Sequence, residues 1–133
     1  MAREALDPAG IYDNALKPSW LVFDWKSDLN RDASIQGLMT FAVDRSYELA
    51  RMLGTEKEVS DWPKLTARMK SAARNAYYDR KSGLVLSGPD KQASYLSQVW
   101  MVLSGTLSAK EGARARGTGK FPTQEKMGCP FSA

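Results

Sequence analysis

The segment Gln92–Ser104 is apolar on almost every side when wound into a helix, and this constrains the fold more than any other feature. Seven of its positions carry large apolar or aromatic side chains: Tyr95, Leu96, Val99, Trp100, Met101, Val102 and Leu103. A helix without a polar face is buried on most sides. Because Gly105 follows as a stop signal, we expect a short helix that needs neighbours on several sides.

Two longer segments have the periodicity of amphipathic helices. The first runs from about Arg31 to Leu53 and stops at Gly54, and its apolar face consists of Ile35, Leu38, Met39, Ala42, Leu49 and Leu53. The second runs from about Asp61 to Tyr78, and its stripe consists of Trp62, Leu65, Met69, Ala72, Ala73 and Ala76. Most basic side chains of the second helix lie off this stripe, which predicts an outer face in solvent.

Turn and capping residues divide these helices. Ser60 is a good N-cap for the second helix, and Asp28 or Asn30 can cap the first. A turn at 79–83 leads into a brief extended segment at 84–86. The spacing of Ser108 and Glu111 is that of a capping box and predicts a fourth helix.

The fourth helix is followed by a stretch rich in helix breakers. Apolar periodicity is lost after about Ala115, and glycines and prolines accumulate. We therefore predict a helical domain over residues 1–115 and an unstructured tail over 116–133.

Composition excludes several kinds of chemistry. The chain has one cysteine and no histidine, so a zinc site or a Cys-His nucleophile pair cannot be built from it. Acid/base chemistry must use Asp, Glu, Tyr or Lys, and no cofactor or metal is expected. No apolar run approaches the roughly 20 residues that span a bilayer, and no signal peptide is visible. These observations predict no membrane partner and leave the localisation undetermined.

The distribution of charge argues against nucleic-acid binding. The net charge is +4, but residues 108–133 carry five basic and two acidic side chains and the preceding residues carry a net charge of only +1. A basic stripe along one helix face, which nucleic-acid-binding domains usually show, is missing. We therefore expect no nucleic-acid partner.

The expected helices do not cover one another. One half-exposed helix and one nearly all-apolar helix imply an outer and an inner layer. A single helix pair plus a third helix leaves that third helix exposed, so the chain needs more protein around it than it contains. We expect exposed helix faces and self-association through them.

The ordered motifs resemble those of a known enzyme fold. Residues 20–25 (WLVFDW) followed by 29–37 (LNRDASIQG) resemble the six-hairpin, (α/α)6-barrel glycoside hydrolases, most closely the α-L-rhamnosidases of glycoside hydrolase family 78. There a loop with an Asp-Trp pair leads into an inner helix, and Asn30 here replaces the usual Asp. Residues 48–54, 77–84 and 87–101 continue the series, so the resemblance covers roughly residues 3–113.

The resemblance implies an all-α fold of helical hairpins from an (α/α)6 barrel, here incomplete. It also implies hydrolysis of a terminal α-L-rhamnosyl bond by an inverting acid/base pair. In the rhamnosidases the acid lies in an upstream Arg-Asp-Glu motif and the base is a downstream Glu, and neither is found here. Asp28 and Asp32 are four residues apart, but we interpret them as capping residues. We expect no catalytic residue and a chain that is inactive alone.

Three residues are candidates for contacting a carbohydrate. The indole of Trp25 can stack on a pyranose and the carboxylate of Asp24 can accept hydroxyl hydrogens. Gln92 and Ser94 lie at the start of the next inner helix, at the same end. The amide of Gln92 and the hydroxyl of Ser94 can bind sugar hydroxyls. The alternatives are that Trp25 packs in the core, that Asp24 caps a turn, and that Gln92 and Ser94 cap a helix. A non-catalytic helical interaction module is the alternative function for the whole chain.

Overall fold

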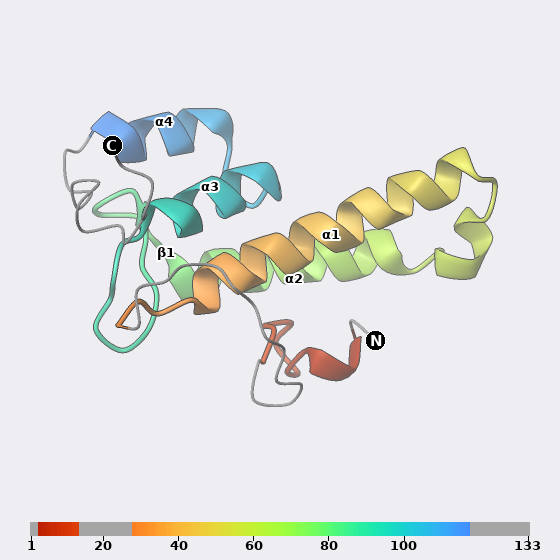
Figure 1. Cartoon of the computed structure of the whole chain (residues 1–133), viewed down its shortest axis with the longest axis horizontal. Helices are drawn as coiled ribbons and strands as arrows, with labels where there is room; N and C mark the ends of the chain where they lie inside the picture. Colours follow the sequence, from red (N-terminus) through yellow and green to blue (C-terminus); the bar gives the residue numbers. More distant parts are fainter. Residues whose placement is uncertain (1–2, 14–27, 118–133) are drawn as a thin grey trace.

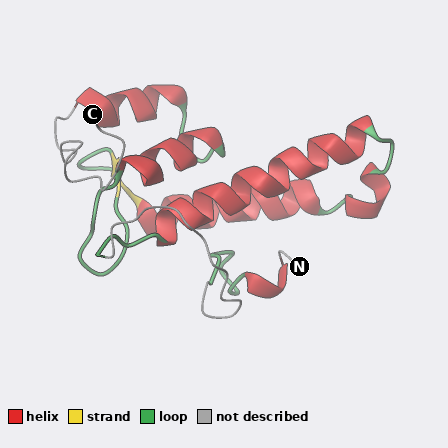
Figure 2. Ribbon diagram, viewed as in Figure 1, coloured by secondary structure: helices red, strands yellow, loops and turns green. Residues whose placement is uncertain are grey.

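The computed structural model describes residues 3–13 and 28–117, and these residues are mostly helical (Figures 1 and 2). Asp24, Trp25 and most of the predicted tail lie outside the described residues. The elements, in order, are η1 (Arg3–Ala5), α1 (Asp32–Met52), η2 (Glu56–Val59), α2 (Trp62–Tyr77), β1 (Tyr78–Asp79), β2 (Leu84–Val85), α3 (Tyr95–Leu103) and α4 (Ala109–Gly117). The predicted all-α fold is confirmed, since the sheet consists of two residue pairs in a single antiparallel ladder.

The helices α1 and α2 form a long antiparallel hairpin that projects beyond the rest of the described chain (Figure 1). Val43 packs with Leu65 and Met69, while the amide of Gln36, two turns earlier on α1, donates to the carbonyl of Met69. The predicted stripe of α2 therefore faces α1 through Leu65 and Met69. The helix α1 meets it through Gln36 and Val43, which lie outside the predicted stripe of α1, whereas Ala42 of that stripe is exposed. Gly54, with φ of +70°, ends the first helix as predicted.

The helices α1 and α3 lie side by side and run in the same direction. Asn30 meets Gln92 just before the two helices begin. Seven residues further along α1, Gly37 lies against Trp100 of α3. The ring of Trp100 also packs against Phe41, with ring centroids 5.8 Å apart. This pairing brings the N-terminal ends of α1 and α3 to one end of the structure.

The helices α3 and α4 form a second, shorter hairpin and run antiparallel to each other (Figure 1). The predicted capping box is present, because the Ser108 amide donates to Glu111 at 2.9 Å and the Glu111 amide donates to the Ser108 hydroxyl at 3.2 Å. Arg74 forms an ion pair with Glu111, which ties α2 to α4. The helix α4 continues to Gly117, and the predicted tail from residue 118 onward lies outside the described residues.

The core consists of two clusters of buried residues. One cluster joins α1, α2, β2 and α3 and consists of Ala33, Ala73, Val85, Met101 and Leu107. The other lies inside the α1–α2 hairpin around Met69, which is 0% exposed. The first cluster therefore joins the α1–α2 hairpin to α3, and the second holds α1 and α2 together.

Two expectations about helix surfaces need correction. Ser60 does not cap α2: the chain forms η2 just before it, and the helix begins after Asp61 without a side-chain cap. The expected burial of α3 on most sides is also only partial, because Tyr95 is 44% and Leu103 is 51% exposed. Both side chains line a cavity between α3 and α4.

The far end of α1 is apolar and exposed. Leu49, Met52 and Leu53 are 55%, 84% and 69% exposed, although Leu49 and Leu53 belong to the predicted apolar face. Their exposure agrees with the expectation that this chain leaves helix faces uncovered. Within residues 3–13 and 28–117, no helix combines the length and apolarity needed to cross a membrane.

Candidate functional site

Polar side chains from two loops meet where α1 and α3 begin. The amide of Gln92 accepts a hydrogen bond from the Asn30 backbone at 2.7 Å and donates to the carbonyl of Asp28 at 3.0 Å. These two contacts join segments that lie more than 60 residues apart in the sequence. The loop before α3 is therefore bound directly to the last residues before α1.

Ser87 makes a second connection between the same segments. Its hydroxyl donates to the Asn30 side chain and accepts a hydrogen bond from the Ala33 backbone at 3.1 Å. Ser87 is completely buried, so both hydrogen bonds are shielded from water. Asn30 also accepts from the Asp32 amide at 3.1 Å and donates to its carboxylate at 3.2 Å. The N-cap position of α1 is Arg31, whose side chain forms no cap. The predicted candidate Asn30, one position earlier, and Ser87 from a distant loop instead accept from the first two amides of the helix.

The loop between Ser87 and Gln92 closes on itself. The two residues exchange backbone hydrogen bonds of 2.8 and 2.9 Å. Gly88 has φ of +74°, and a Cβ atom there would lie 2.6 Å from the side chain of Asn30. Only glycine combines this backbone conformation with such a close approach, which explains the Gly-Pro pair at the start of the loop.

The structure places one of the three predicted carbohydrate contacts in this site. Gln92 is partly exposed, and its bonds to Asp28 and Asn30 use one N–H hydrogen and one lone pair of the amide. An amide has two of each, so contacts with the described residues leave one donor and one acceptor position. Asp24 and Trp25 lie outside the described residues, a few positions before Asp28. Ser94 is the N-cap of α3, since its hydroxyl accepts from Ser97 at 3.1 Å.

Acidic groups surround the site but do not form a metal centre. Asp28, Asp32 and Asp90 are all exposed at this end. Within the described ranges, no cluster of three or more His, Cys, Asp or Glu side chains has the geometry to hold a metal ion. Carboxylates of this kind can accept hydrogen bonds from sugar hydroxyls.

Two carboxylates elsewhere have pKa values shifted away from those of a general acid. Hydrogen bonds from Ser82 and Lys81 lower the pKa of Asp79, and Arg74 with Ser108 lowers the pKa of Glu111 to about 2. A general acid in glycoside hydrolysis has a raised pKa. We therefore interpret both carboxylates as structural. Asp79 stabilises the turn between β1 and β2, and Glu111 stabilises the start of α4.

The roles of two buried glutamines could not be predicted from the sequence. Gln98 donates to the carbonyl of Val85 at 2.8 Å and accepts from its amide at 2.9 Å. Gln36 accepts from Tyr12 at 2.7 Å and donates to Gly10 at 3.0 Å. Each glutamine side chain binds one backbone N–H group and one backbone carbonyl of an extended segment, as a neighbouring strand would. The only signal in the sequence is a polar residue next to an apolar stripe, which does not identify its partner.

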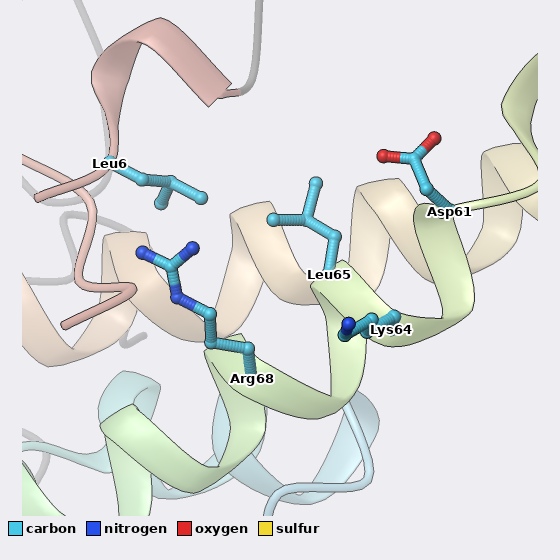
Figure 3. A pocket seen from close by; sticks show the side chains of 5 residues that line it. All are labelled: Leu6, Asp61, Lys64, Leu65 and Arg68. Atoms are coloured by element: carbon cyan, nitrogen blue, oxygen red, sulfur yellow. The ribbon is translucent and has the colours of Figure 1, made fainter. Parts of the chain in front are cut away.

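Several cavities lie elsewhere on the described part of the chain, and two of them are lined by residues discussed above. A cavity of about 270 Å³ lies between the segment around Leu6 and α2. Figure 3 shows the side chains that line it: Leu6, Asp61, Lys64, Leu65 and Arg68. The guanidinium of Arg68 is already bound to two carbonyls of the N-terminal segment, those of Asp7 and Pro8. A second cavity of about 270 Å³ lies between α3 and α4, next to Tyr95 and Leu103. Neither includes the residues that join α1 to α3.

Comparison with known proteins assigns the class of fold. The sequence matches no described family and no curated protein. The structure is similar to a rhamnosidase from Klebsiella oxytoca with rhamnose bound, with a TM-score of 0.71 and 30% identity. The match covers 84% of this chain and 21% of that chain. The described helices thus have an all-α, rhamnosidase-like glycosidase fold, and the chain spans about a fifth of the length of this relative.

Proposed function

We propose that this chain forms helical hairpins of an (α/α)6 barrel of the family 78 α-L-rhamnosidase type. The observation that carries the proposal is the similarity to a rhamnose-bound rhamnosidase over 84% of this chain, at 30% identity. The paired hairpins and the shared end of α1 and α3 also support it. In this arrangement α1 and α3 are neighbouring inner helices, and α2 and α4 belong to the outer layer.

The ligand in this proposal is a terminal α-L-rhamnoside, and the binding site is the end where α1 and α3 begin. Trp25 stacks on the C–H face of the sugar and Asp24 accepts hydrogen bonds from its hydroxyls. Gln92 contributes its remaining N–H or lone pair. The support is indirect for Asp24 and Trp25: they lie a few positions before the Asp28–Asn30 segment, which Gln92 binds.

The proposed activity of this chain alone is binding without hydrolysis. Inverting hydrolysis needs an acid and a base roughly 6.5–9.5 Å apart on opposite sides of the scissile bond. The Arg-Asp-Glu motif that carries the acid in the rhamnosidases is absent from this sequence. The structurally similar part is also a fifth of the rhamnosidase, so most of that enzyme has no counterpart here.

Hydrolysis and binding assays on the purified chain test both parts. We expect no release of p-nitrophenol from p-nitrophenyl α-L-rhamnopyranoside above background. Calorimetric titration with L-rhamnose should show weak binding that Trp25→Ala and Asp24→Asn abolish, whereas Trp62→Phe on α2 should have no effect. Turnover that Asp24→Asn abolishes would show that the chain carries its own catalytic carboxylate, and absence of binding would contradict the proposed site.

A second candidate function is a non-catalytic helical interaction module. The exposed apolar side chains at the end of α1 and on α3 favour it, with Met52 84% and Leu53 69% exposed. Sedimentation velocity distinguishes the two functions. An incomplete barrel should self-associate into species of mixed size, and Met52→Gln with Leu53→Gln should reduce this association. An interaction module should sediment as a single monomer or dimer.

A further inference from the structure

The beginning of α1 is held by more than its own residues. The Ser87 hydroxyl accepts from Ala33 at 3.1 Å and donates to the side chain of Asn30. The Gln92 amide binds the backbone of Asp28 and Asn30 from the other side of the same loop. We call this set, formed by Asn30, Ser87 and Gln92, the loop latch.

The latch is not explained by capping of α3. That helix has its own N-cap in Ser94, whose hydroxyl accepts from Ser97 at 3.1 Å. The amide of Gln92 is therefore directed toward the other loop, where it binds two backbone groups. Gly88 allows this contact, because a Cβ atom at its position would meet the side chain of Asn30 at 2.6 Å.

Ser87 is the member of the latch whose role can be isolated. It is 0% exposed, so its hydroxyl cannot reach a ligand in solvent. Any effect of Ser87 on ligand binding must pass through Asn30 and the first turn of α1. Gln92, by contrast, is partly exposed and is itself a proposed sugar contact.

We propose that Ser87 is a positioning residue for carbohydrate binding, and that it acts by fixing Asn30 and the segment around it relative to α3. The inference rests on the proposed function, since the ligand is a terminal pyranoside bound where α1 and α3 begin. A segment that is ordered before binding does not lose conformational entropy when the ligand arrives. Loosening the latch therefore weakens binding without removing any sugar contact.

The experiment combines L-rhamnose affinity with amide hydrogen exchange in the full chain. Ser87→Ala should weaken L-rhamnose binding about tenfold, the equivalent of one lost hydrogen bond. It should also accelerate exchange at the amides of Asn30 and Ala33, while Met69 in the core stays protected. Ser104→Ala serves as the control, because it removes another buried hydroxyl, 2% exposed, at the opposite end of α3.

The outcomes separate the positioning role from a merely structural one. Weaker binding and faster local exchange with Ser87→Ala, but not with Ser104→Ala, support the proposal. Equal affinity for the unsubstituted chain and Ser87→Ala, or equal loss with both serine variants, overturns it. If the unsubstituted chain does not bind L-rhamnose, the proposed function fails. Amide hydrogen exchange in Ser87→Ala then tests only whether Ser87 fixes the segment around Asn30. Selective acceleration at Asn30 and Ala33 supports this role, and unchanged exchange overturns it.

Discussion

Gly37 of α1 lies directly against the backbone of Trp100 on α3. A Cβ atom at Gly37 would be 2.8 Å from the Cβ atom and 2.9 Å from the carbonyl carbon of Trp100. The two helices therefore approach closely at this point, about six residues from the start of each. This crossing places Asn30 beside Gln92 and so determines the geometry of the candidate site.

Gly37→Ala should destabilise the fold, although alanine is the better helix former. The gain in helix propensity is about 1 kcal/mol, and separating the two backbones costs about 1–3 kcal/mol. The difference predicts a net loss of up to about 2 kcal/mol in the free energy of unfolding, measured with urea. Ser46→Ala, on an exposed face of the same helix, should change stability by less than about 0.5 kcal/mol.

Gly112 provides a contrasting case. A Cβ atom there would meet the side chain of Val102, with one of its methyl groups at 2.5 Å. Because that side chain can move, Gly112→Ala should cost clearly less than Gly37→Ala. Equal losses for both glycines would contradict the close crossing of α1 and α3.

The Arg74–Glu111 pair should make stability depend on acid pH. The Arg74 guanidinium, together with the Ser108 amide, holds the pKa of Glu111 at about 2, below its ordinary 4.5. Since the folded-state value is the lower one, the stabilisation is complete above pH 4.5 and is lost as the pH falls toward 2.

Solvent limits the size of this effect. The side chains of Arg74 and Glu111 are 37% and 22% exposed, so we expect about 1 kcal/mol. Glu111→Gln should flatten the acid limb of the stability curve. Glu48→Gln removes an exposed ion pair with Arg45 on α1 and should leave that limb unchanged. An acid limb that is identical in Glu111→Gln and the unsubstituted chain would contradict the account.

Asn30→Asp should weaken the loop latch in a pH-dependent way. The Asn30 amide now donates to the Asp32 carboxylate at 3.2 Å, and the substitution replaces this donor with a second negative charge. Repulsion between two ionised carboxylates at a solvent-exposed position costs about 1 kcal/mol. The loss of stability should therefore be larger near neutral pH than at about pH 3. Adding Asp32→Asn should recover most of it, and a loss that is independent of pH would contradict this assignment.

Gln98→Met should strongly lower the free energy of unfolding, although the two side chains have similar volumes. It leaves the amide and the carbonyl of buried Val85 without the partners they have at 2.9 and 2.8 Å. Each unsatisfied buried group costs about 1–3 kcal/mol, so we expect a loss of at least 2 kcal/mol in unfolding free energy. A loss below about 1 kcal/mol would mean that water replaces the glutamine.

The helices of this fold follow from local sequence signals. The stripe around Leu65 and Met69 indicates where α1 and α2 face each other, and Ser108 with Glu111 marks the start of α4. These signals involve residues three or four positions apart, so one sequence is enough to detect them. The extended segment at Leu84 was also predictable, but its partner strand at Tyr78 was expected to be the end of a helix.

The long-range polar contacts could not be predicted in the same way. Ser87 and Ala33 are 54 residues apart, and Gln92 and Asp28 are 64 apart. A buried serine has no periodicity that identifies its partner. Gln92 was expected to bind sugar or to cap a helix, and the structure adds its role in joining two loops. Leu49 and Leu53 have the pattern of buried residues, yet no described element covers them.

Chemical-shift mapping with L-rhamnose tests the central claim most directly. The account predicts saturable shifts in amides of residues 28–33 and 87–94, where α1 and α3 begin, and none at Leu49 to Leu53 on the far end of α1. D-glucose should produce much smaller changes at the same concentrations. Absence of saturable shifts, or shifts confined to the far end of the α1–α2 hairpin, would contradict a rhamnoside site at the start of α1 and α3.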